Sequence, residues 1–189
     1  VAAPVRAARA AEHRAGYRPP PGIGMVNLPP QRAPASFDEL LARAPTWDDV
    51  AWLRSQTSLP LLLKGVLHPL DARQAAALQV AGLIVSNHGG RTLDSAAAAA
   101  RALPRIADAV GDSTPLLVDG GIQRGTDIAK ALALGARAVL VGRPLLWALA
   151  SAGAAGVAHA LRVLRDELVI TMAQCGAASL DELGRELLL

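Results

Sequence analysis

Residues 82–91 read GLIVSNHGGR, a short apolar run that ends in polar residues and a pair of glycines. The run is apolar on both faces, as strands buried in a parallel sheet are. Three more segments have this form. They cover residues 59–65, 115–120 and 138–143, and the polar groups near their ends are Lys64, Asp119-Gly120-Gly121 and Gly142-Arg143.

Sequence typical of helices separates these runs. We expect helices over residues 46–55, 69–81, 95–110 and 125–134, and helical sequence from Pro144 to the end of the chain. The first has the form of a capped start, with Thr46 followed by an acid at Asp49. Four consecutive strand–helix units with short connections predict a parallel sheet in an α/β fold.

Such a sheet fits an open doubly wound fold or half of an eight-stranded barrel. The polar groups favour the barrel, because they gather at the C-terminal ends of all four strands, where (β/α)8 TIM barrels build their sites. Barrels often bind phosphate after strands seven and eight, so the four runs are predicted to be strands five to eight. Residues 46–189 would form this C-terminal half. Residues 1–45, rich in proline and arginine, would form a loop after strand four.

Composition narrows the functional classes. Cys175 is the single cysteine, which excludes an internal disulfide and favours a reducing, cytoplasmic location. The net charge is +3, but residues 1–35 hold five arginines against one glutamate, a balance of +4, so the remainder sums to −1. This distribution argues against nucleic-acid binding. We expect no membrane span, because Arg137 and Arg143 interrupt the best apolar run, and no signal peptide.

The segment after residue 85 carries the strongest chemical signal. His88 can accept a proton near neutral pH, the two glycines after it leave space for a ligand, and Arg91 offers a planar fork suited to a carboxylate. Lys64 ends an apolar strand, where a cation can stabilise developing negative charge. The structural alternative for Lys64 is a side chain that extends to solvent from a strand end.

The last two strand ends predict a phosphate site. Gly120, Gly121 and Gly142 expose backbone N–H groups, two helices begin here, and Arg143 adds a full charge. Asp119 is placed to accept hydrogen bonds from sugar-like hydroxyls. Glycine-rich turns that merely close strand–helix units are the structural alternative.

These motifs together resemble the FMN-dependent 2-hydroxy-acid oxidases and dehydrogenases, which include glycolate, lactate and hydroxymandelate oxidases and mandelate dehydrogenase. The resemblance covers roughly residues 46–185. It rests on the four separated motifs LLLKG (61–65), IVSNHGGRTLD (84–94), VDGGI (118–122) and VGRP (141–144), which occur in order.

The resemblance implies FMN as the cofactor and a small 2-hydroxy acid as the substrate. His88 would take the substrate proton, Lys64 would stabilise reduced flavin, and Arg91, with Arg9 as a second arginine, would bind the carboxylate. The implied cofactor contacts are Lys64, Ser86, Asp119, Gly120, Gly121, Gln123, Gly142 and Arg143. No metal is implied, and the enzyme would need its N-terminal half, from the same or a separate chain, and would form a homo-oligomer.

The chain departs from the family pattern at Gln123, where the family usually has arginine, so one phosphate contact would be weakened or moved to Arg124. Two alternatives to the oxidation of an L-2-hydroxy acid stay open. One is another phosphate-binding flavin barrel enzyme, and the other is an inactive truncated paralogue or fragment.

Overall fold

The computed structural model of the chain describes residues 38, 42, 44–93 and 95–188. The predicted segment 1–45, including Arg9, therefore lies almost entirely outside the described residues. In chain order the elements are α3 (Trp47–Gln56), β1 (Leu62–Val66), α4 (Pro69–Ala77), β2 (Gly82–Val85), α5 (Ala99–Val110), β3 (Leu116–Asp119), α6 (Gly125–Ala133), β4 (Ala138–Leu140) and α7 (Arg143–Cys175).

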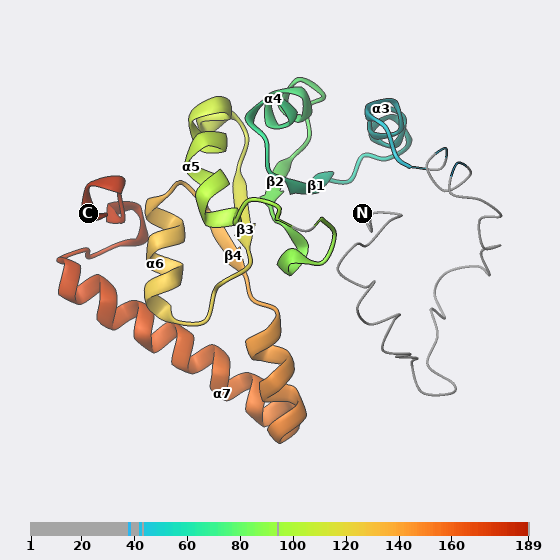
Figure 1. Cartoon of the computed structure of the whole chain (residues 1–189). Helices are drawn as coiled ribbons and strands as arrows, with labels where there is room; N and C mark the ends of the chain where they lie inside the picture. The colour runs from blue at the N-terminus through green and yellow to red at the C-terminus, as the bar shows by residue number, and fades with distance from the viewer. Residues whose placement is uncertain (1–37, 39–41, 43, 94, 189) are drawn as a thin grey trace, which may run out of the picture.

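The four strands form one parallel sheet in the order β1-β2-β3-β4, as the four repeated units predicted (Figure 1). Each strand returns through a helix to pair with its predecessor. The pairing therefore brings all four C-terminal strand ends to the same edge of the sheet. Between Lys64 and Val66 the register of β1 shifts by one residue, so that Lys64 pairs with Ile84 but Val66 pairs with Val85.

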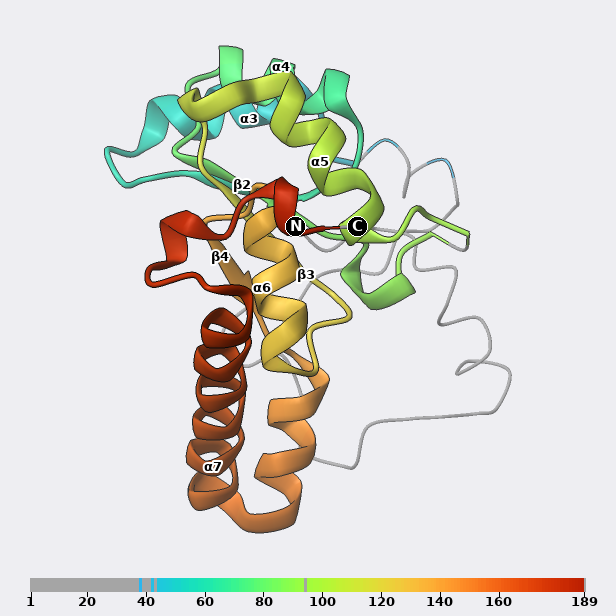
Figure 2. The same ribbon diagram turned by 90° about the vertical axis from the view of Figure 1, so that its left-hand side faces the viewer.

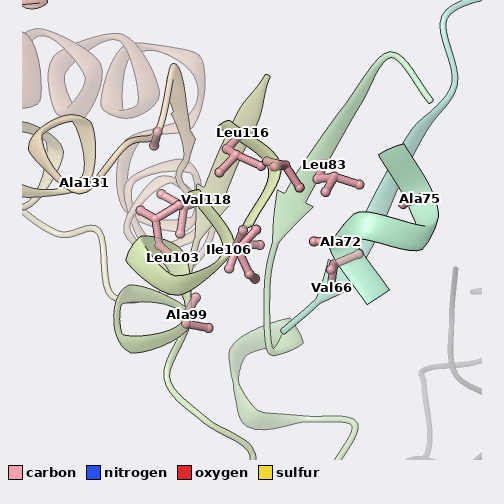
Figure 3. Close-up of a cluster of buried hydrophobic side chains, with 14 of the residues drawn as sticks. Val66, Ala72, Ala75, Leu83, Ala99, Leu103, Ile106, Leu116, Val118 and Ala131 are labelled. Atoms are coloured by element: carbon pink, nitrogen blue, oxygen red, sulfur yellow. The ribbon is translucent and has the colours of Figure 1, made fainter. Parts of the chain in front are cut away.

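The hydrophobic core lies between the sheet and the helices α4, α5 and α6 (Figure 3). From the strands, Leu83, Val85 and Val118 point into it and are at most 2% exposed. From α5, Leu103 and Ile106 are fully buried against them. Alternate strand residues thus face the helices, as the period of two requires.

The opposite face of the sheet is less covered. Ile84 and Leu117 lie on it in register with Lys64, and both are only half-buried. In the part of the chain that the structure describes, β1 and β4 each pair on one side only. In native proteins such edges and sheet faces are commonly covered by other polypeptide.

Several helix boundaries follow their expected chemistry. Thr46 caps α3, and both its N–H and its hydroxyl donate to Asp49, at 2.7 and 2.8 Å. These two hydrogen bonds, the backbone one first, hold the pKa of Asp49 below its ordinary value. Two helix boundaries between β1 and β3 were predicted wrongly. Helix α5 begins at Ala99 rather than at Ser95, whose φ is +61°, and α4 ends at Ala77 rather than at Ala81.

Helix α7 is bent into two limbs, and the chain reverses its direction between them (Figure 2). The bend is at Ala152 and Gly153, whose φ and ψ are not helical, and Gly153 has φ +56°. Gly156 lies where the limbs meet, because a Cβ there would overlap the carbonyl of Ala148. The helix ends at Cys175, where Gly176 adopts the left-handed conformation, rather than continuing to the chain end.

The bend bears on the expectation of no membrane span. By length and composition α7 could cross a membrane, with a mean hydropathy of 1.4 over 18 residues, none of them buried. The run after Arg143 was therefore underestimated. Every 18-residue stretch of α7 with at most two charged residues, however, contains the bend at Ala152 and Gly153. Neither straight limb alone provides such a stretch.

Candidate functional site

Lys64 lies in the middle of β1, which continues to Val66 rather than ending at the lysine, and it is on the face of the sheet away from the core helices. Its ammonium group donates to the hydroxyl of Ser86 at 2.7 Å and forms an ion pair with Asp119 at 2.5 Å. Lys64 lies within β1, Ser86 directly follows β2, and Asp119 ends β3. The parallel order of the sheet is therefore what brings together residues 22 and 55 positions apart in sequence.

Ser86 is the buried link in this group, with only 2% of its surface exposed. Its oxygen also accepts the backbone N–H of His88 at 3.0 Å. One hydroxyl thus connects the Lys64 ammonium group to the backbone of His88.

His88, Gly89 and Gly90 form a tight turn in which all three residues have positive φ, at +56°, +67° and +74°. Two of them are glycines, which adopt this conformation without steric cost. Asn87 stabilises the turn, because its side-chain oxygen accepts from Gly90 N at 3.3 Å and its backbone carbonyl accepts from the same N–H at 3.0 Å. The sequence motif assigned no role to Asn87, although asparagine side chains commonly accept backbone N–H groups in turns.

Arg143, at the start of α7, reaches this turn from across the strand ends. Its Nη2 donates to the carbonyl oxygen of Gly89 at 3.0 Å. The sequence predicted a phosphate contact for Arg143, and the structure adds this contact with the backbone beside His88.

The two helix N-termini at this edge differ. At α6, the N–H groups of Gln123 and Arg124 donate to Asp127 at 3.0 and 2.9 Å, and Gly125 N donates to Glu167 at 2.8 Å. Carboxylates of the chain itself thus occupy this end. The expectation that both helix starts serve a phosphate therefore fails at α6, because Asp127 is its capping acid.

The N-terminus of α7 has no such occupant. Gly142 precedes it without a side-chain cap, and the first turn contains no acidic residue. A Cβ placed on Gly121 or Gly142 would meet no atom within 4 Å. Pro144 has no N–H, and those of Leu145 and Leu146 donate to the Gly142 carbonyl, so the helix dipole and the charge of Arg143 are the main attractions for an anion at this open end.

Two pockets lie at this edge of the sheet, and Lys64 and His88 line both. The first, which we call the strand-end pocket, has a volume of about 320 Å³. Its lining includes Lys64, His88, Gly89, Arg91, Asp119, Gly120, Gly121, Gln123, Gly142 and Arg143. The structure thus brings together every described residue of the predicted site except Ser86, which lines the second pocket.

The second, which we call the side pocket, has a volume of about 650 Å³ and extends toward α3. Apolar side chains such as Trp47, Leu67 and Leu93 form much of its wall. Sequence reasoning gave these residues no role, because an apolar residue near a strand end looks like any core residue.

The strand-end pocket can be tested for its fit to a phosphorylated ligand with hydroxyl groups. Asp119 Oδ1 is buried and has no hydrogen-bond partner, the one such side-chain atom among the described residues. A buried carboxylate oxygen in this state requires a donor. The open end at α7 suits a phosphate, and Lys64 adds a cation beside Asp119. Within the described residues, no cluster of three or more His, Cys, Asp or Glu could hold a metal ion.

A parallel α/β sheet with a histidine, a lysine and an uncapped helix start at its strand ends is typical of phosphate-binding α/β enzymes. Within that class, the chain matches the FMN-dependent dehydrogenase family over residues 1–189. It therefore belongs to that family.

The relatives include an L-lactate oxidase of Alicycliphilus denitrificans, 51% identical over 93% of this chain and 51% of that protein. A peroxisomal (S)-2-hydroxy-acid oxidase of Oryza sativa subsp. japonica is 53% identical over 74% of this chain and 38% of that protein. A pre-mycofactocin synthase of Mycolicibacterium smegmatis is 50% identical over 75% of this chain and 36% of that protein. The chain is thus about equally similar in sequence to three proteins that carry different enzyme names.

Solved structures agree with this placement. A mandelate oxidase with (S)-2-phenylpropionate has a TM-score of 0.85 and 40% identity, over 96% of this chain and 51% of that one. The same enzyme with benzoyl-formic acid gives 0.84 and 42%, again over 96% and 51%. The chain spans about half the length of the lactate oxidase and mandelate oxidases it matches.

Proposed function

We propose that this chain is the C-terminal half of an FMN-dependent enzyme that oxidises an L-2-hydroxy acid to the 2-oxo acid. The observation that carries the proposal is the composition of the strand-end pocket. It joins a histidine, an exposed arginine and a lysine–aspartate ion pair to an uncapped helix N-terminus. Such a pocket combines a base, an arginine that can bind a substrate carboxylate, and a site for phosphate.

FMN fits the cofactor side of this pocket. Arg143, the start of α7 and the glycines at 120, 121 and 142 would hold its phosphate, and Gln123 lies at the same wall. Asp119 Oδ1 would accept from the ribityl hydroxyls, which would satisfy its missing hydrogen bond. Lys64 and Ser86 would lie against the ring.

When bound, FMN supplies the acceptor for the two electrons and the hydrogen that leave the substrate carbon. His88 accepts the hydroxyl proton and holds it on its imidazole. Arg91 binds the substrate carboxylate through its planar fork, which orients the hydroxyl toward His88. Lys64 stabilises the negative charge that develops in the pocket. Arg9, in the segment 1–45, would be a second arginine that binds the substrate carboxylate.

The sheet is proposed to be strands five to eight of a (β/α)8 barrel, with residues 46–189 as this half and residues 1–45 as the lid after strand four. The unpaired outer sides of β1 and β4 and the half-covered sheet face support this assignment. The N-terminal half, from the same or a separate chain, would cover them. Exposed apolar residues on α7, such as Trp147 and Ile170, suit contact with that half and with further subunits of a homo-oligomer. We propose a cytoplasmic location, in keeping with the single cysteine.

The test uses the chain assembled with the strand-one-to-four half of the same protein. The assembled protein should release FMN on denaturation, and its flavin should be reduced by at least one of L-lactate, glycolate and (S)-mandelate. Release of FAD or of no flavin would exclude the cofactor assignment. Bound FMN that no 2-hydroxy acid reduces would favour the alternatives, an inactive paralogue or a different flavin enzyme.

A further inference from the structure

The turn that carries His88 is held in an unusual conformation by contacts from several sides. His88 has a Cβ and still adopts φ +56°, a conformation that L side chains rarely adopt. Ser86 holds its N–H, Asn87 holds the N–H of Gly90, and Arg143 holds the carbonyl of Gly89. The first two anchors are local, but Arg143 is 54 residues away from Gly89 in sequence.

Arg143 can approach this turn only because Gly89 has no side chain. A Cβ on Gly89 would lie 2.6 Å from Nη2 of Arg143, closer than such contacts occur. Gly89 is therefore needed twice, for its φ of +67° and for the approach of the guanidinium. A side chain at position 89 would therefore disturb both the backbone of the turn and its contact with Arg143.

Arg143 also stands at the anion end of the strand-end pocket, as the first residue of α7. A guanidinium has five N–H donors in a rigid fork, and the Gly89 carbonyl accepts from one nitrogen only. The remaining donors can bind a phosphate at the helix start while the first contact persists. A lysine ammonium has a single nitrogen and lacks the spread of this fork.

We propose that Arg143 is a positioning residue for His88, and that a phosphate bound at the start of α7 holds the His88 turn in place through it. The proposal rests on the proposed function for the identity of the cofactor, but the coupling itself requires only a phosphate. On this proposal, the phosphate group of the bound ligand helps to orient His88.

The experiment measures backbone hydrogen exchange of residues 88–91 in the assembled protein, with and without saturating FMN. In the parent, FMN should slow exchange in the turn. In Arg143→Met and Gly89→Ala the turn should stay unprotected at saturating FMN. Gly89→Ala keeps the arginine for the phosphate, so its FMN affinity should fall less than that of Arg143→Met. Arg162→Met, which removes a charge elsewhere on α7, should behave as the parent.

Flavin reduction gives the second measurement. At saturating FMN and substrate, both turn variants should reduce more slowly by about 10²-fold, as for a misplacement near 1 Å, and their pH profiles should change. Protection and reduction equal to the parent in Arg143→Met would overturn the proposal and leave Arg143 a phosphate ligand only. Should FMN fail to bind, inorganic phosphate replaces it as the probe. Arg143-dependent protection by phosphate would then support the coupling while the proposed function fails, and its absence would overturn both.

Discussion

The ammonium group of Lys64 lies 2.5 Å from Oδ2 of Asp119, while Oδ1 of the same carboxylate is buried without a partner. One side of the carboxylate thus fixes the cation, and the other side is left to bind a ligand. The two side chains are 32% and 19% exposed, so solvent reaches the pair only in part. Two predictions separate these two roles.

Asp119→Asn should weaken FMN binding, because an amide replaces the charged acceptor for the ribityl hydroxyls. Hydrogen bonds to charged groups are worth about 1.5–3 kcal/mol, which corresponds to roughly 10- to 100-fold in the dissociation constant. Fluorescence titration of the assembled apoprotein with FMN measures this. Asp112→Asn, which alters an exposed acid after α5, serves as the control. Equal affinity of Asp119→Asn and the parent would remove Asp119 from the cofactor site.

Lys64→Met should slow flavin reduction and weaken sulfite binding more than it lowers the thermal midpoint, because the charge of Lys64 acts on the ligand. The variant also leaves Asp119 without its cation. Comparing the double variant with Asp119→Asn alone removes that second effect and isolates the loss of the ammonium group. An unchanged reduction rate in Lys64→Met would reduce Lys64 to a partner of Asp119.

Gln123→Arg should strengthen FMN binding. Gln123 is exposed and lines the strand-end pocket, whereas Arg124 does not line it, so the expected transfer of the contact to Arg124 gains no support. A new cation at an exposed site contributes up to about 1 kcal/mol, or roughly fivefold, and less at high salt. Thr126→Arg places the same charge on α6 outside the pocket. An equal gain in FMN affinity in both variants would indicate a general electrostatic attraction and not a direct contact with the phosphate.

Lowering the pH should release the cap of α3. The N–H and hydroxyl of Thr46 lower the pKa of Asp49 in the folded chain below 3.8. A lowered folded-state pKa means that the stabilisation is present above the unfolded-state value and is lost as the pH falls through the folded-state value. NMR titration of the Asp49 carboxyl and the Thr46 amide should give one common midpoint below 3.8. A midpoint at or above 3.8 would show that the hydrogen bonds do not persist in solution.

The sequence was sufficient for the sheet because each strand is a continuous apolar run followed by a polar end. Parallel order then placed Lys64, Ser86 and Asp119 together without further information. The sequence was not sufficient to predict contacts that depend on detailed side-chain geometry, such as the hydrogen bond between Arg143 and Gly89. At α6 the signal was present and misread, since an acid at the third helical position is typical of a cap.

The bend in α7 could not be predicted from periodicity. Ala152 and Gly153 lie within a run of small residues that is equally compatible with a straight helix. The deciding fact is tertiary, because Gly125 sits so close to Glu167 and Leu168 of the second limb that a Cβ would overlap them. The packing of α6 on that limb fixes its direction, and the chain must turn between the limbs.

His88 and Arg91 give the most discriminating prediction, because their variants should differ in kind. If His88 is the base, His88→Asn should slow flavin reduction by about 10²–10⁴-fold. FMN should stay bound, because the phosphate end of the pocket is formed after β3 and β4. Arg91→Lys should first raise the substrate dissociation constant, because a point charge cannot reproduce the bidentate fork. Stopped-flow reduction by L-lactate, glycolate and (S)-mandelate separates the rate from the affinity. A His88→Asn enzyme that reduces its flavin as fast as the parent would show that another group takes the proton.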